Sequence, residues 1–201
     1  MKSDVIMVSS HGGDMTAALK QAEKVAEYKE MPLKNALHLR LLTEEMMGLM
    51  RSITGETEGQ FWIEDEDDEY RLHLSVKTNM TSEKREKLLA ASSSGRNETA
   101  RGLMGRLRDL FDQSADEDVI SLSSPLLLDG AYEHAVTPGF EWEWSMLRYE
   151  NELNARIKRN DGAAKEAWDE LEKSVVARVA DDVKVGIKGR QVEMTIVKKM
   201  A

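Results

Sequence analysis

The longest amphipathic pattern in the chain lies between Pro32 and Gly55. Apolar residues recur there at spacings of three and four, at Leu39, Leu42, Met46, Leu49 and Ile53. This spacing is typical of a helix that buries a single stripe of side chains. The pattern therefore predicts one long core helix.

Shorter patterns predict the remaining elements. Alternation and apolar runs bounded by polar residues predict strands at 4–10, 61–63 and 70–76, and a C-terminal hairpin over 183–197 with a turn at 188–190. Helical spacing predicts helices at 15–30, 82–91, 100–111, 142–157 and 168–179, with a loop-rich stretch at 112–139. These elements together predict an α+β protein.

Two polar stretches lack the signature of a known site. The six acidic residues Glu64–Glu69 have neither the ligand spacing nor the glycine bend of a calcium loop, so we expect a solvated hairpin tip. The stretch 9–14 carries Gly12 and Gly13 between a strand and a helix. It lacks the Walker lysine and the dinucleotide fingerprint, and we expect a plain turn there.

The core helix carries the first candidate site. Glu44 and Glu45 lie beside its apolar stripe, one turn before Gly48 and Leu49. A glycine inside a helix costs about 1 kcal/mol relative to alanine unless another group must approach it closely. Two interpretations stay open: a boundary glutamate with a glycine where another element packs, or a ligand-binding helix.

The predicted helix at 100–111 carries the second candidate site. Gly102 and Gly105 leave backbone amides accessible near its positive end, beside Arg96 and Arg101. An anion would suit this position. Glycines three apart also permit close helix packing, so this alternative stays open as well.

Composition narrows the function classes. The 201 residues suit one domain, and the absence of cysteine excludes disulfides, thiolate zinc sites and cysteine nucleophiles. A net charge of −9 argues against binding to nucleic acid, which needs Lys and Arg to displace counterions. No apolar run is long enough for a membrane span, and no signal peptide is evident, so we expect a cytoplasmic protein.

The order of elements resembles the GHKL (histidine-kinase-like) ATPase superfamily, and among its branches the anti-sigma-factor kinases. The best local matches are LRLLTEEMMGLMRSITG for the ligand helix of that family and GRNETARGLMGRLRDLF for its second glycine box. The resemblance covers 4–112 and 181–199 and leaves 113–180 as a helical insertion within a single domain, 1–201. It implies a two-layer α/β sandwich with a mixed, mostly antiparallel sheet and helices on one face.

The resemblance also implies a nucleotide site that has lost part of its motifs. In the family, a helix glutamate activates a water or hydroxyl, and an asparagine four residues later binds the Mg²⁺ that bridges the ATP phosphates. Here Gly48 follows Glu44, and Leu49 follows Glu45, so this ligand is missing in either register. Near the adenine-binding position the chain offers only Asn79. The residues that agree with the phosphate-holding second box are Gly95, Arg96, Arg101, Gly102 and Leu103.

We therefore expect a cytoplasmic regulatory protein with weakened or lost binding of ATP and Mg²⁺, without turnover, that acts on a protein partner such as a sigma factor or another regulator. Two alternatives stay open. One is an active ATP-dependent serine kinase or ATPase with Glu44 or Glu45 as the base. The other is an interaction module that uses the insertion as a docking surface and binds no nucleotide. The oligomeric state, a homodimer included, is left open.

Overall fold

The fold is taken from a computed structural model that describes residues 1–9, 15–54, 58–77, 142–188 and 191–200. The predictions for 10–14, 82–91, 92–97, 100–111 and 112–139 lie outside these residues. The same is true of the tip of the C-terminal hairpin at 189–190.

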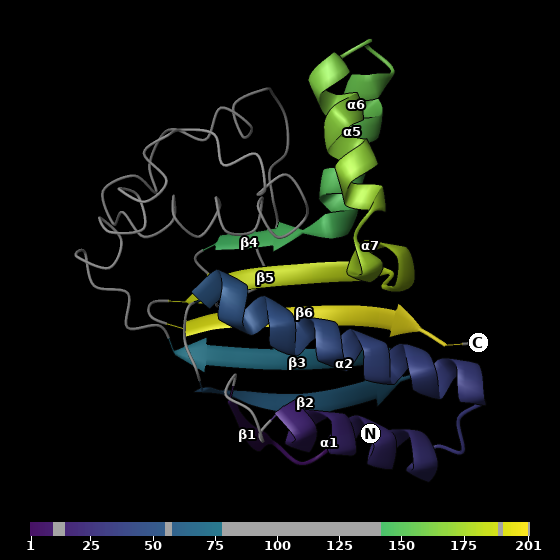
Figure 1. Cartoon of the computed structure of the whole chain (residues 1–201), viewed down its shortest axis with the longest axis vertical. Coiled ribbons are helices and arrows are strands. Elements are labelled where there is room, and N and C mark those ends of the chain that lie inside the picture. The colour runs from purple at the N-terminus through teal and green to yellow at the C-terminus, as the bar shows by residue number, and fades with distance from the viewer. Residues whose placement is uncertain (10–14, 55–57, 78–141, 189–190, 201) are drawn as a thin grey trace.

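A six-stranded antiparallel sheet forms one layer of the molecule (Figure 1). Its strands are β1 (Ile6–Ser9), β2 (Glu58–Glu66), β3 (Glu69–Lys77), β4 (Trp142–Ser145), β5 (Asp182–Lys188) and β6 (Gln191–Lys199). They follow the order β1-β2-β3-β6-β5-β4. A mixed sheet was expected, but each pairing between the described strands is antiparallel.

Helices form the second layer. The described part contains α1 (Met15–Tyr28), α2 (Leu33–Thr54), α5 (Met146–Ile157), α6 (Gly162–Glu172) and α7 (Val175–Val179). Figure 1 shows α1 and α2 lying across one face of the sheet, while α5 and α6 extend as a pair beyond the β4 edge. Helix α2 contacts β3, β6 and α7. The predicted α+β class is confirmed.

The apolar stripe of α2 lies in the core, as its spacing predicts. Leu39, Leu42 and Met46 are fully buried, and Leu49 is almost so. Alternate residues of β3 and β6 meet this stripe from the sheet, namely Tyr70, Leu72, Leu74, Val76, Val192, Met194 and Ile196. Burial of this apolar area on both layers is the main stabilising contribution to the fold.

The predicted helix at 142–157 is wrong at its start. Residues Trp142–Ser145 form β4, which pairs with β5 through Trp144 and Val185, and α5 begins only at Met146. Ser145 is extended and its hydroxyl accepts a hydrogen bond from the Arg148 amide, so it caps the helix. The tryptophans at 142 and 144 suit a pleated strand, and the cap fixes where the helix starts.

The acidic run is only in part the solvated tip that we expected, since Glu66, Asp67 and Asp68 are exposed but the residues on either side are partly buried. Strand β2 continues through Glu66, and only Asp67 and Asp68 form the turn, both with positive φ. Aspartate tolerates this backbone region better than most residues. The strand continues because Glu64 and Asp65 find cationic partners, described below.

The predicted helix at 168–179 is broken in two. Helix α6 ends at Glu172, and Ser174 caps the short α7 through a hydrogen bond from the Ala177 amide. The C-terminal hairpin is confirmed, since β5 pairs with β6, and β6 in turn pairs with β3. Because β4 joins this sheet, the range 113–180 is not helical throughout.

Candidate functional site

Helix α2 presents Glu44 and Gly48 to solvent on its outer side. The two residues are four apart and therefore lie on the same helical face. Glu45 is half-buried, at the boundary of the core. Of the two candidate glutamates, Glu44 is the one aligned with the glycine.

The space around Gly48 shows whether close packing requires a glycine at this position. A Cβ atom at this position would meet no atom of the described residues within 4 Å. Close packing of another described element does not account for this glycine. The contrast is Gly59 in β2, where a Cβ would lie 3.1 Å from the Ser75 carbonyl oxygen.

The other predicted site residues belong to a segment outside the described part of the chain. Outside the described residues lie Asn79, Gly95, Arg96, Arg101, Gly102 and Leu103. The described chain ends at Lys77 on β3 and resumes at Trp142 on β4. Lys77 and Lys188 both pair with Gln191, so these strand ends lie at the same end of the sheet. The C-terminal end of α2 lies at this same end of the sheet (Figure 1).

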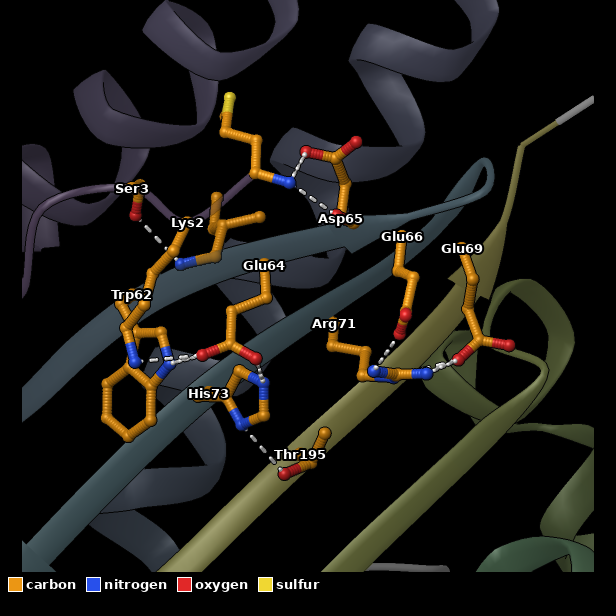
Figure 2. A network of polar contacts seen from close by, with 12 residues as sticks. Lys2, Ser3, Trp62, Glu64, Asp65, Glu66, Glu69, Arg71, His73 and Thr195 are labelled. Atoms are coloured by element: carbon orange, nitrogen blue, oxygen red, sulfur yellow. Dashed lines mark hydrogen bonds and ion pairs between the residues drawn. The ribbon is translucent and has the colours of Figure 1, made fainter.

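A second group of polar side chains lies on the opposite face of the sheet, and the sequence analysis missed it. Trp62, His73 and Thr195 are cross-strand neighbours on β2, β3 and β6. Figure 2 shows them with Glu64 and Lys2. We call these five residues the Trp62–His73 cluster. The alternation of the strands shows which residues share a face, but which residues stand opposite depends on the register, which the sequence does not state.

Hydrogen bonds and stacking hold this cluster together. The Trp62 and His73 rings are parallel, with centroids 4.9 Å apart. Trp62 Nε1 donates to Glu64 Oε1 at 2.9 Å, and the Lys2 ammonium lies 2.9 Å from the same oxygen. On the imidazole, Nδ1 lies 3.2 Å from the Thr195 hydroxyl, and Nε2 lies 3.5 Å from Glu64 Oε2 (Figure 2).

The environment sets the charge of each group. Burial lowers the pKa of His73, and the positive charges of Lys2 and Arg71 add to this, while the Glu64 carboxylate opposes it. The hydrogen bond from Lys2 lowers the pKa of Glu64. At neutral pH, His73 is therefore neutral and Glu64 is charged. We assign the ring proton to Nε2, which faces the carboxylate, so that Nδ1 accepts from Thr195.

Asp65 and Arg71 bind their partners close to this cluster. The Asp65 side chain is largely buried, and its Oδ2 lies 2.5 Å from the Lys29 ammonium of the α1–α2 connection. Burial alone would raise the pKa of Asp65, but the hydrogen bonds from Lys29 and from the amino group of Met1 outweigh it, so this pKa is lowered.

Arg71 pairs with Glu69 at 2.7 Å and with Glu66 at 3.3 Å. These pairs explain why the acidic run is part of the folded sheet.

Within the described ranges, no group of three or more His, Cys, Asp or Glu side chains is placed to hold a metal ion. Among the described helices, none is both long and apolar enough to cross a membrane. No family model matches the chain, and neither a curated protein nor a solved structure matches it. The function must therefore be argued from the residues themselves.

Proposed function

We propose that this chain is a cytoplasmic regulatory protein on a two-layer sandwich of the histidine-kinase-like ATPase type. In this proposal it resembles the anti-sigma-factor kinases, binds ATP weakly or not at all, and acts through a protein partner. An antiparallel sheet with α1 and α2 across one face, and the C-terminal hairpin paired to β3, supports this fold type.

The observation that carries the proposal is the pair Glu44 and Gly48 on the outer side of α2. Glu44 is the carboxylate that this proposal assigns to the base of the family, and the next residue on that face, Gly48, has no side chain. Mg²⁺ requires oxygen ligands in a near-octahedral arrangement, and phosphoryl transfer depends on a positioned metal together with a positioned base. With one carboxylate alone, Mg²⁺ would keep mostly water and phosphate ligands, so nucleotide binding gains little from the metal.

Calorimetric titration of the full chain with ATP tests this proposal. We expect no saturation below millimolar nucleotide, or weak binding that is the same with and without Mg²⁺, and no release of phosphate. Glu44→Gln and Glu45→Gln should leave this behaviour unchanged, as should the control Glu27→Gln, an exposed glutamate on α1. Mg²⁺-dependent binding with phosphate release, lost in one of the α2 variants but not in the control, would establish the active kinase or ATPase instead.

A second candidate function is an interaction module on the same fold. Three large apolar side chains are exposed around the α1–α2 connection, with 76% of Tyr28, 76% of Leu33 and 54% of Leu37 accessible. Leu33 and Leu37 are four apart and share one face of α2, and exposed apolar residues on one face are typical of protein contacts. In this reading the simplest partner is a second copy, and sedimentation should show a dimer that Leu33→Ser with Leu37→Ser dissociates. A monomer at all concentrations would contradict this form of the interaction.

A further inference from the structure

The Trp62–His73 cluster contains one carboxylate and two basic side chains that can carry charge. Glu64 is the carboxylate, and Lys2 and His73 approach its two oxygens at 2.9 Å and 3.5 Å. Arg71 also lies near, but Glu66 and Glu69 already pair with it. Glu64 is thus the acid that Lys2 and His73 share.

The same cluster holds the segment before β1 against β2. The Lys2 ammonium lies 5.0 Å from the centre of the Trp62 ring, in addition to its contact with Glu64. The next residue, Ser3, donates its amide to the Ile63 carbonyl at 2.8 Å and accepts from the Ile63 amide through its hydroxyl at 2.9 Å. Lys2 and Ser3 therefore form one part of the attachment of this segment, beside the Met1 amino group on Asp65 at 3.2 Å and a hydrogen bond from Gln21 to the Ser3 hydroxyl at 2.9 Å.

Protonation of His73 changes the charge balance of this attachment. The charged groups that face the imidazole are Glu64 from β2, Lys2 from the N-terminal segment and Arg71 from its own strand, while Thr195 on β6 is uncharged. With a neutral ring, Lys2 and Glu64 form a balanced pair. An imidazolium would place a second cation on the same carboxylate and would repel the first.

We propose that the cluster is a proton-sensitive attachment, in which protonated His73 shares the Glu64 charge with Lys2 and repels the Lys2 ammonium, so that Lys2 and Ser3 loosen from β2. The buried Nε2 atom, which has no hydrogen-bond partner in the described part, gains a charge-assisted bond to Glu64 in this state. Nδ1 then donates to the Thr195 hydroxyl, which can accept as well as donate. Acidification thereby regulates how firmly the chain leading into the edge strand β1 is held.

The protonation of His73 and the attachment of Lys2 are thermodynamically linked, so each can be tested through the other. If protonation of His73 weakens the attachment of Lys2, then removal of the Lys2 charge must make His73 easier to protonate. Repulsion between the two cations raises this midpoint even where Lys2 stays attached, so the midpoint reports the coupling and the protection of the Ser3 amide reports the loosening. The proposal requires both results.

The experiment is an NMR titration of the full chain from about pH 8 to about pH 5, the range in which histidine titrates. His73→Gln identifies the ring signal of His73 among the four histidines. Lys2→Met should raise the His73 midpoint by about 0.3 pH unit or more, as expected for a partly screened charge at this range. The control is Lys165→Met, an exposed lysine on α6, away from the cluster, which should leave the midpoint in place.

Hydrogen exchange at the Ser3 amide supplies a second readout, measured in the wild type and in His73→Gln. We expect its protection factor to fall at least about threefold as the wild type crosses the His73 midpoint, and to be independent of pH in His73→Gln. Equal protection on both sides of the midpoint would overturn the proposal. An unchanged or lowered midpoint in Lys2→Met would do the same.

Discussion

At Gly59 an added methyl group would contact the Ser75 carbonyl oxygen and Val76 Cγ2 at 3.1 Å, whereas at Gly48 it would meet no described atom within 4 Å. We expect Gly59→Ala to lower the free energy of unfolding by about 1–3 kcal/mol, because a backbone carbonyl cannot move aside cheaply. Gly48→Ala should raise it by about 0.5–1 kcal/mol, since alanine favours a helix. Urea denaturation measures both, and a stabilised Gly59→Ala variant would contradict the packing described at β2 and β3.

His73 provides a prediction for pH dependence. Burial lowers its pKa in the folded state below the ordinary value of about 6.5, so the unfolded chain takes up the proton first. The contribution of neutral His73 is complete above about pH 6.5 and is lost as pH falls through the folded pKa. The free energy of unfolding should therefore fall between pH 7 and pH 5 in the wild type and fall less in His73→Gln, as urea midpoints at several pH values would show.

At the scale of the element, the two sides of α2 should respond differently to truncation. Leu42 is fully buried against the sheet, while 54% of Leu37 is exposed. We expect Leu42→Ala to cost about 2–5 kcal/mol, because it removes buried area and leaves a cavity, and Leu37→Ala to stay within about 0.5 kcal/mol. Thermal and urea unfolding of the two variants test this difference. Equal losses of unfolding free energy would mean that α2 packs on the sheet through another of its faces.

The elements that the sequence predicted well are those in which one pattern runs over many residues. The three-and-four spacing of α2 and the alternation of Tyr70 to Val76 specified both the element and its buried face. The errors came where a local contact outweighed the pattern. Ser145 starts a helix four residues later than expected, and Ser174 divides another. The strand through Glu64 and Asp65 depends on cations from distant parts of the chain.

At the scale of the whole molecule, the sheet order and the Trp62–His73 cluster are the features that the sequence alone did not specify. The stacking of Trp62 on His73 requires a particular register between β2 and β3, and Thr195 arrives from a strand more than a hundred residues later. The resemblance led us to expect Glu44 and Gly48 on a ligand helix. Both residues are exposed on α2, and the nucleotide site, these two residues included, stays a prediction.

The central claim is that α2 lines a nucleotide site whose metal ligand has been replaced by Gly48. Restoring the side chain tests it most directly, because Gly48→Asn adds an oxygen ligand one turn after Glu44 at a position where the added Cβ meets no described atom within 4 Å. We predict that ATP binds this variant at least about tenfold more tightly with Mg²⁺ than without it, a gain of about 1.4 kcal/mol, while the wild type shows no such dependence. A correctly folded Gly48→Asn variant that binds no nucleotide, with or without Mg²⁺, would contradict the claim.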